Sequence, residues 1–220
     1  MDSVKALNLN LRKTLNKGSV SLTNPAGCPS INLFLFDPDV LQGPLSHEEA
    51  QAVVAEPAYW SFCWASGQVL ASYILAHPEL VTGKIVVDFG SGSGVVAIAS
   101  AMSGAKRVYA CDSDHDALDS VISNANANQV NVIVIDKLDK VPEDIDLITA
   151  ADVLYDQENH LLLDYFFQQS KQVLVADSRV KTLPSKHYDL LTVLEACTWP
   201  DLNEFEEFNQ VRLYISKNGQ

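Results

Sequence analysis

From residue 59 to the C-terminus, short apolar runs alternate with stretches in which apolar residues recur every three or four positions. Apolar runs rich in β-branched residues predict strands, and the period of three to four predicts helices. The expected strands are 84–88, 107–111, 130–135, 145–151, 172–176, 190–195 and 208–215. The expected helices are 65–77, 95–102, 116–128 and 161–170. Strands separated by helices pair in parallel, so the pattern predicts a doubly wound α/β fold with one mostly parallel, seven-stranded sheet.

The first 55 residues follow a different pattern. An alternating run at 31–36 predicts a strand, and Ser46 and Glu49 have the spacing of a helix capping box. The turn-forming dipeptides of this part are Asn24-Pro25, Asp37-Pro38 and Gly43-Pro44. We therefore expect a helix, a turn, a strand and a further turn in an N-terminal extension, 1–55, laid on a main domain at 56–220.

Charge narrows the range of partners. The chain has 15 basic and 28 acidic residues in 220, a formal net charge of −13. A protein that binds nucleic acid needs basic surface to neutralise phosphates, so nucleic acid is not expected as a partner. A cationic partner, such as a lysine side chain, is favoured instead. No apolar run reaches the roughly 18 residues of a membrane span, so no membrane association is expected.

The start of the chain and its cysteines bear on location. The first 13 residues lack the apolar block of a secretory signal. Their basic bias has a faint likeness to a mitochondrial presequence, but a short amphipathic helix and a cytoplasmic location are favoured. The four cysteines form no CxxC pair and the five histidines no HxxxH pair, so no metal site is expected. Three of the cysteines are expected to be buried thiols of a reducing compartment.

A glycine-rich segment, Asp88-Phe-Gly-Ser-Gly-Ser-Gly94, lies between an expected strand and an expected helix. Gly90, Gly92 and Gly94 can take positive φ and let the backbone approach a ligand closely. The helix that follows offers unpaired N–H groups and the positive end of its dipole. Ligands in such sheets bind at the carboxyl ends of strands, where the strand order reverses. We expect this loop, including Ser91, to bind a ligand.

The spacing of the loop separates two classes of nucleoside cofactor. The dinucleotide fingerprint G-x-G-x-x-G needs glycine at position 95, where this chain has Val95. Asp112 ends the next expected strand, 22 residues after Gly90, where a carboxylate can accept hydrogen bonds from both ribose hydroxyls. Asp136 ends the third strand and is expected near the adenine. The pattern predicts a nucleoside site that is not an NAD site.

These motifs resemble those of the seven-β-strand class I methyltransferases, a Rossmann-like family. The resemblance lies in the glycine loop at 87–94, in Asp112 and in the run Ala-Asp-Val-Leu-Tyr-Asp at 151–156. Within that class the chain is similar to the lysine methyltransferases of family 16, above all to the electron transfer flavoprotein β-subunit lysine methyltransferase group and its bacterial relatives. That group has Tyr-Trp and then Trp-x-x-Gly-Gln before the first strand, matched here at 59–68. The similarity begins near residue 31 and is densest at 59–156.

The resemblance implies S-adenosylmethionine as methyl donor, S-adenosylhomocysteine as product and a role for each matching residue. Asp88 and the glycine backbone would hold the methionine part and Asp112 the ribose. The residues implied to bind the cofactor are Trp60, Trp64, Gln68, Asp88, Gly90, Ser91, Gly92, Gly94, Asp112, Asp136 and Ala151. Asp152 and Tyr155 would lie beside the acceptor amine and act in catalysis.

The chemistry of an amine acceptor fits these last two residues. A lysine begins as an ammonium ion with a pKa of about 10.4 and must lose a proton before it can attack. Asp152 can attract and orient it, and Tyr155 can offer a hydrogen bond or an aromatic face. In the alternative interpretation Asp152 caps a turn and Tyr155 packs in the core, as Trp60 and Trp64 can equally do.

Three functions stay open on the sequence. The favoured one is a protein-lysine N-methyltransferase, with a protein substrate that carries the target lysine. The second is a small-molecule N-methyltransferase of nicotinamide type, with a small amine acceptor, and the third is a non-catalytic cofactor-binding module. The fourth strand does not end in Asn/Asp-Pro-Pro-Tyr, the signature of enzymes that methylate planar amides and adenine.

Overall fold

A seven-stranded sheet forms the centre of the computed structural model, which describes residues 3–40, 51, 55, 57–202 and 205–217. The strands are β3 (Ile85–Phe89), β4 (Arg107–Cys111), β5 (Ile133–Ile135), β6 (Ile145–Ala151), β7 (Ser170–Asp177), β8 (Tyr188–Glu195) and β9 (Gln210–Ser216). Their spatial order is β5-β4-β3-β6-β7-β9-β8. Strand β9 is antiparallel to both of its neighbours, and the other pairs are parallel. The predicted doubly wound, mostly parallel sheet is confirmed.

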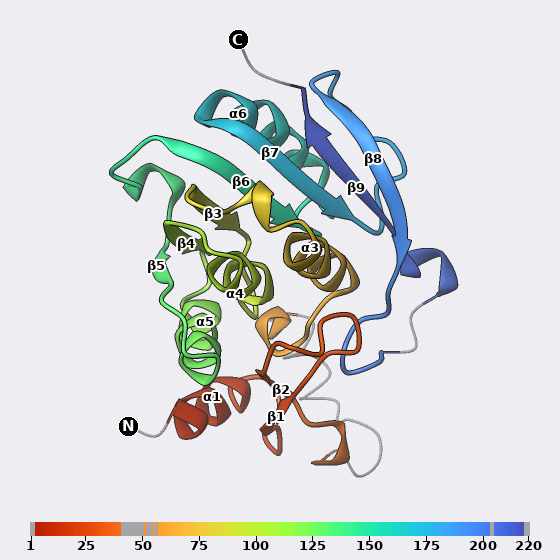
Figure 1. The fold of residues 1–220 in the computed structure, drawn as a ribbon. Coiled ribbons are helices and arrows are strands. Elements are labelled where there is room, and N and C mark those ends of the chain that lie inside the picture. The colour runs from red at the N-terminus through yellow and green to blue at the C-terminus, as the bar shows by residue number, and fades with distance from the viewer. Residues whose placement is uncertain (1–2, 41–50, 52–54, 56, 203–204, 218–220) are drawn as a thin grey trace.

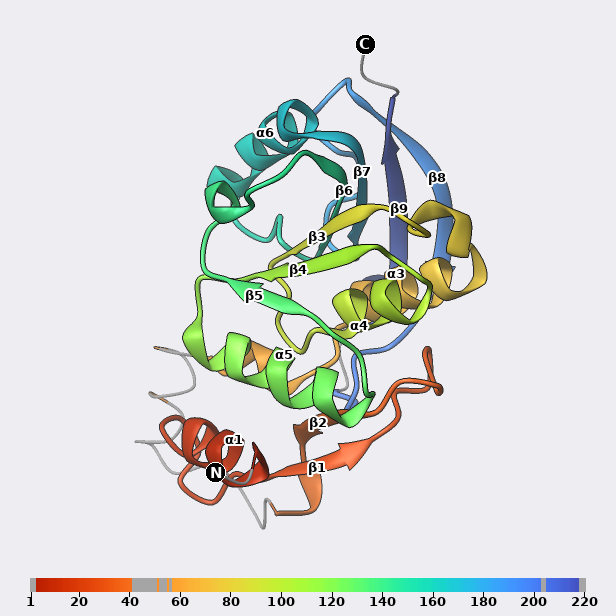
Figure 2. The same cartoon turned by 60° about the vertical axis from the view of Figure 1, so that its left-hand side comes forward.

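Helices cover both faces of the sheet. The helices α3 (Ala65–Ala76), α4 (Val95–Met102) and α5 (His115–Ala127) lie on one face, and α6 (Leu162–Gln169) lies on the other (Figures 1 and 2). Successive strand residues point to opposite faces, so Leu147 packs in the core under α3 and α4 while Ile148 packs under α6. Burial on both faces explains why the strands are nearly continuous apolar runs. None of the helices in the described ranges is both long and apolar enough to cross a membrane.

The boundaries differ from the sequence pattern at five strands. β3 is shifted by one residue, β5 starts three residues later than expected, β7 is longer at both ends, β8 starts two residues earlier, and β9 starts at Gln210. The short 3₁₀ helices are η1 (Pro38–Val40), η2 (Tyr59–Ser61), η3 (Pro78–Leu80), η4 (Leu138–Lys140), η5 (Gln157–Leu161) and η6 (Glu206–Asn209). The first two residues of the expected last strand, Phe208 and Asn209, thus belong to η6. Strand ends are set by pairing with neighbours, which a local pattern does not contain.

The N-terminal extension contains α1 (Ser3–Leu11) and an antiparallel hairpin of β1 (Val20–Thr23) and β2 (Leu33–Phe36). The expected helix and the strand at 31–36 are confirmed, whereas β1 was not predicted. Its sequence, Val-Ser-Leu-Thr, is too short to give a clear alternation. The predicted turn at Gly43-Pro44 and the capping box of Ser46 and Glu49 lie outside the described residues.

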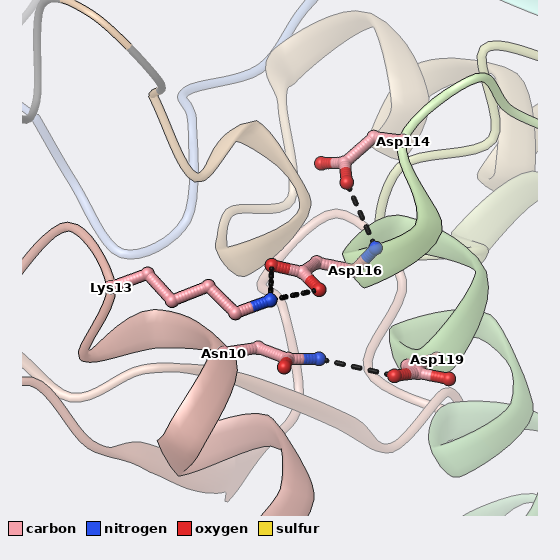
Figure 3. A network of polar contacts seen from close by, with 5 residues as sticks. All are labelled: Asn10, Lys13, Asp114, Asp116 and Asp119. Atoms are coloured by element: carbon pink, nitrogen blue, oxygen red, sulfur yellow. Dashed lines mark hydrogen bonds and ion pairs between the residues drawn. The ribbon is translucent and has the colours of Figure 1, made fainter.

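The extension docks on α5. Leu7 and Leu11 of α1 are buried in an apolar cluster that also contains Ala117 of α5. Figure 3 shows the polar contacts of the same interface: Lys13 donates to both carboxylate oxygens of Asp116, at 2.7 and 2.8 Å, and Asn10 donates to Asp119 at 3.1 Å. Ion pairs this exposed contribute at most about 1 kcal/mol, so the buried leucines dominate the docking.

Candidate active site

An open cavity of about 980 Å³ lies at the carboxyl ends of β3, β4, β5 and β6. The strand order reverses between β3 and β6, which is where open α/β sheets bind ligands. The predicted site residues that line this cavity are Trp60, Trp64, Gly90, Gly92, Asp112, Asp136, Ala151, Asp152 and Tyr155. A smaller hollow of about 40 Å³ lies against the glycine loop and is lined by Trp64, Asp88, Gly90, Ser91, Gly92 and Ala151, among others. Gln68 and Gly94 line neither space.

The glycine loop has the backbone that its sequence predicts. Gly90, Gly92 and Gly94 have φ of +68°, +49° and +80°. A Cβ at Gly90 would lie 2.6 Å from the Cγ1 atom of Val153, and one at Gly94 would lie 3.1 Å from Val121. At Gly92 the nearest atom would be 4.0 Å away. Two of the glycines are therefore needed for close packing within the protein, and Gly92 leaves room for a ligand beside the loop.

A buried hydroxyl in the same loop fits a bound polar group. Ser91 Oγ is buried and has no hydrogen-bond partner among the described residues. A buried polar atom without a partner costs free energy, so in native structures it usually meets a ligand or water. The backbone of Gly90 and Ser91 is held in place because both N–H groups donate to the carbonyl of Cys111, at 2.8 and 3.2 Å. The loop therefore offers a fixed cradle that suits the polar end of a nucleoside-linked ligand.

Asp88 supports this loop from inside. Its side chain is 2 % exposed; one carboxylate oxygen accepts from Thr149 Oγ1 at 3.0 Å and the other from the Ala97 N–H at 3.1 Å. Burial raises the pKa of Asp88 to about 7, against the lowering effect of these two hydrogen bonds. Both oxygens are already engaged by β6 and α4. Asp88 thus fixes the first turn of α4 under the glycine loop.

Asp112 and Asp136 lie on the wall of the large cavity. Asp112 accepts from the N–H groups of Gly92 at 2.9 Å and Asp114 at 3.0 Å, one on each carboxylate oxygen. Burial raises its pKa. Each oxygen keeps a further lone pair, so the carboxylate can also accept two ribose hydroxyls. Asp136 pairs with Lys140 at 2.5 Å, and this partner lowers the pKa of Asp136.

Asp152 is held by two serines from distant parts of the chain. Its Oδ1 atom accepts from Ser66 Oγ at 2.6 Å and from the Oγ and N–H of Ser178 at 2.9 and 3.1 Å. Among the described residues, its Oδ2 atom accepts only a long hydrogen bond, 3.3 Å, from the Ser66 N–H. The residue has φ of +52°, an uncommon value outside glycine. Asp152 therefore joins α3 to the end of β7, as a capping residue would, and still borders the cavity.

Three aromatic rings gather at the mouth of the cavity. Tyr155 is 67 % exposed, so the interpretation that it packs in the core is wrong. Its ring centroid lies 6.2 Å from that of Tyr59, which is 50 % exposed and lies 5.7 Å from that of Trp64. Partial burial raises the pKa of Tyr155, so the phenol stays protonated near neutral pH. The part of the cavity lined by Tyr59 and Tyr155 is thus an open aromatic surface.

Trp60 and Gln68 occupy structural positions. Trp60 is fully buried against α1 and α5, although part of it borders the large cavity. Gln68 is buried in α3; its amide nitrogen donates to the carbonyls of Cys63 at 3.0 Å and Cys197 at 2.5 Å, and its oxygen accepts from the Gly27 N–H at 3.0 Å. All these partners are backbone groups. The structure therefore places Gln68 as a clamp between three segments, away from the place where it was expected to cover the cofactor.

The sequence pattern did not single out several residues that line or shape the site. Tyr59, Asn159 and Arg179 line the cavity, and Ser66 and Ser178 hold Asp152. Tyr59 carried a usable signal, since it belongs to the Tyr-Trp pair of the resemblance. The two serines lie 86 and 26 residues from Asp152, so no local spacing links them to it.

Comparisons with known proteins agree with this geometry. Residues 70–179 match the family described as ribosomal protein L11 methyltransferase (PrmA). The electron transfer flavoprotein β-subunit lysine methyltransferase of Mus musculus is 38 % identical over 127 residues, 54 % of this chain and 50 % of that protein. Its counterpart from Rattus norvegicus is 31 % identical over 179 residues, 78 % of this chain and 69 % of that protein. The chain thus spans between about half and two thirds of these relatives.

A solved structure shows the same fold. Magnesium protoporphyrin IX methyltransferase from Synechocystis, determined with bound S-adenosylhomocysteine, superposes with a TM-score of 0.53 over 81 % of this chain and 90 % of that one, at 12 % identity. The strand order, the glycine loop and the matched residues 70–179 all indicate a methyltransferase fold. The chain belongs to the ribosomal protein L11 methyltransferase (PrmA) family of class I methyltransferases.

Proposed function

We propose that this protein is an S-adenosylmethionine-dependent N-methyltransferase that acts on a lysine side chain of a protein. One observation carries the proposal: a single cavity is lined both by the glycine loop and Asp112 and by Asp152 and Tyr155. The names of the mouse and rat relatives, both lysine methyltransferases, support a protein acceptor. The net charge of −13 favours a cationic acceptor over a polyanion.

The donor end suits the cofactor in shape and chemistry. When bound, S-adenosylmethionine supplies an electrophilic methyl group attached to a sulfonium. The backbone of Gly90 and Gly92 would hold its methionine part, and the carboxylate of Asp112 would accept from its ribose hydroxyls. These groups are held by hydrogen bonds within the protein, so little rearrangement is needed for binding.

The acceptor site has to hold a lysine side chain and allow its ammonium group to lose a proton. The less engaged oxygen of Asp152, Oδ2, can accept a hydrogen bond from the ammonium and orient it. A carboxylate also favours the charged amine, so water has to take up the proton. Tyr59 is half exposed and Tyr155 is two thirds exposed, so water reaches this side of the cavity. Positioning a neutral amine about 3 Å from the methyl carbon accounts for most of the expected rate gain.

The test is a transfer assay with methyl-labelled S-adenosylmethionine. The purified protein is incubated with a cell extract and, separately, with purified electron transfer flavoprotein β-subunit, the substrate named for the relatives. We expect label in protein, on lysine side chains when digested peptides are analysed by mass spectrometry. Asp112→Ala serves as the control that lacks the ribose contact. Label confined to small molecules would support the nicotinamide-type alternative, and no label with cofactor bound would support a non-catalytic module.

A further inference from the structure

The three rings at the cavity mouth are fixed relative to one another. The indole N–H of Trp64 donates to the backbone carbonyl of Tyr59 at 2.9 Å, which sets the position of Trp64 beside Tyr59. The Tyr59 and Trp64 rings meet at 62° and the Tyr59 and Tyr155 rings at 41°. Tilted rings form corners and leave faces uncovered, whereas stacked rings would cover each other. The cluster is therefore a preformed aromatic surface: the Trp64 ring also meets Phe62, at 5.8 Å, and the Tyr59 and Tyr155 rings stay exposed.

Core packing does not explain this cluster. Half of Tyr59 and two thirds of Tyr155 are exposed, and neither belongs to the buried apolar clusters of the fold. Large aromatic side chains that remain exposed side by side, next to a cavity, usually mark a binding surface. Two tyrosines and a tryptophan together are the side chains best suited to bind an organic cation through their ring faces.

The position of the cluster connects it to the reacting end of the cofactor site. Trp64 lines both the large cavity and the small hollow against the glycine loop, so it stands where the two spaces meet. Tyr59 and Tyr155 line the large cavity together with Asp152, and their rings are in contact with each other. A group bound between the rings would therefore lie next to the donor end.

The charges around the cavity also favour a cation. Among the described residues that line it are five aspartates, namely Asp112, Asp114, Asp136, Asp139 and Asp152, against two basic residues, Lys137 and Arg179. Most of the capacity of Asp152 to accept hydrogen bonds is already used by Ser66 and Ser178. A charged acceptor entering this cavity is thus attracted by the acidic wall, and the less engaged Oδ2 atom of Asp152 is left to accept from it. Ring faces can bind the charge beside that oxygen.

We infer that Tyr59, Trp64 and Tyr155 form an aromatic binding site for the alkylammonium group of the acceptor, in its unmethylated and methylated forms. Tyr59 is thereby a substrate-positioning residue. The inference rests on the proposed function, because it names the subsite through which a lysine acceptor is held. Binding through ring faces needs no N–H donor on the ligand, so the site accepts each methylated product as well as the starting lysine.

The experiment measures binding without any methyl transfer. The probe is Nα-acetyl-Nε-trimethyl-lysine methylamide, and its comparison compound has carbon in place of the charged nitrogen. Both are titrated into the whole 220-residue chain in the presence of saturating S-adenosylhomocysteine, with detection by NMR. We expect the charged probe to bind about tenfold or more tightly than the neutral one, because three rings contribute. Equal affinity would show a merely apolar site and overturn the inference.

Variants of Tyr59 assign the effect to the rings. Tyr59→Leu should weaken binding of the charged probe about fivefold, and Tyr59→Phe, which keeps a ring, should change it less than about twofold. The matched control is Phe205→Leu, another exposed aromatic residue with a ring neighbour, Phe208 at 6.3 Å, that does not line the cavity. It should leave probe binding unchanged.

The affinity for S-adenosylhomocysteine separates a substrate site from a cofactor lid. It should change less than about twofold in both Tyr59 variants, because the proposed donor contacts are made by Gly90, Gly92 and Asp112 and none by the Tyr59 side chain. A larger loss for the cofactor than for the probe would overturn the inference and make the rings part of the cofactor site. Charge-selective probe binding without transfer to any lysine would refute the proposed function alone, so the two failures are distinguishable.

Discussion

The residues of the proposed donor site and those of the proposed acceptor site differ in how firmly the fold holds them. The proposed donor site consists of the loop backbone at Gly90, buried Asp88 and partly buried Asp112, whose atoms are engaged within the protein. The proposed acceptor site combines two exposed rings, Tyr59 and Tyr155, with Asp152, whose carboxylate is held by two serines. The donor site thus shares its contacts with the core of the fold, whereas the exposed rings of the acceptor site have few contacts with it.

This difference bears on how such a protein can change its substrate. A side chain at Gly90 would overlap Val153, after β6, and one at Gly94 would crowd Val121 of α5, so the proposed cofactor side tolerates little change at these two positions. Exposed rings at a cavity mouth have few structural partners, so they can be exchanged at low cost in stability. The donor end is therefore expected to be common to relatives with different acceptors, and the acceptor end is expected to carry the specificity.

The largest effect is expected at Gly90, where fold and donor site coincide. Gly90→Ala places a Cβ at 2.6 Å from Val153 on a backbone with φ of +68°. The strained backbone and the overlap together should lower the free energy of unfolding by about 3 kcal/mol. Binding of S-adenosylhomocysteine should be lost with it, because the loop must move away from Val153. Denaturant unfolding and calorimetry measure the two effects.

Gly83 provides a matched control for this substitution. It has a similar φ of +74°, but a Cβ there would meet no atom within 4 Å. Gly83→Ala should cost about 1 kcal/mol from backbone strain alone and leave cofactor binding unchanged. If the two variants had equal free energies of unfolding, the overlap with Val153 would cost no stability. The packing around Gly90 would then be less tight than described.

Asp152 tests the acceptor end. Asp152→Asn keeps an oxygen that can accept from Ser66 and Ser178 but removes the charge that attracts the amine. Turnover should fall by about 100-fold, the scale on which a positioned proton-handling group contributes. Affinity for S-adenosylhomocysteine should stay nearly constant. Ser178→Ala removes one of the hydrogen bonds without touching the charge and should reduce turnover much less.

The opposite pattern would identify a structural role for Asp152. A lower melting temperature and weaker cofactor binding, with activity falling only in proportion, would mean that its hydrogen bonds to Ser66 and Ser178 are its whole contribution. Wild-type turnover in Asp152→Asn would remove the residue from the mechanism. In either case the contrast between the two ends of the cavity would rest on the aromatic rings.

The sequence predicts the geometry of the glycine loop well because its requirements are local. Positive φ at Gly90, Gly92 and Gly94 follows from their spacing between a strand and a helix, and the position of Asp112 follows from the next strand end. The alternation of strands and helices is equally local, since each strand of a parallel sheet is buried on both faces.

The acceptor end was harder to predict because its contacts join distant segments. The two serines that hold Asp152 come from α3 and from the end of β7, and nothing near Asp152 in the sequence points to them. Gln68 shows the same limit in reverse. It belongs to a motif that suggested cofactor contact, yet its buried amide is engaged by the backbone of Gly27, Cys63 and Cys197.

A smaller effect is expected at Asp112, the residue that connects the loop to the ribose site. Asp112→Ala removes the acceptor for the Gly92 and Asp114 N–H groups and for the ribose hydroxyls. Binding of S-adenosylmethionine should weaken by about 2 kcal/mol, or about 30-fold, by calorimetry. Asp136→Ala should cost less, because that carboxylate is paired with Lys140. Tighter binding of NADH than of S-adenosylmethionine by the wild type would contradict the cofactor assignment.

The smallest effect concerns the buried charge of Asp88, which distinguishes the donor end from the exposed acceptor end. Burial raises the pKa of Asp88 from 3.8 to about 7, so between these values the folded state binds a proton that the unfolded state does not. The free energy of unfolding therefore rises as the pH falls through about 7 towards about 4. Between about pH 8 and about pH 6 this one group should contribute a gain of about 1.4 kcal/mol.

The variant Asp88→Asn isolates this contribution, because the amide that replaces the carboxyl group takes up no proton in that range. Denaturant unfolding at about pH 6, 7 and 8 should show a steeper rise of stability towards low pH in the wild type than in the variant. Asp177, whose pKa burial raises to about 6, remains in both proteins and cancels in the difference. Any change in the hydrogen bond from the Ala97 N–H lowers the stability of the variant equally at each pH, so it shifts the curve without changing its slope. Parallel curves would mean that Asp88 is charged in the fold at neutral pH, with the hydrogen bonds from Thr149 and Ala97 outweighing its burial.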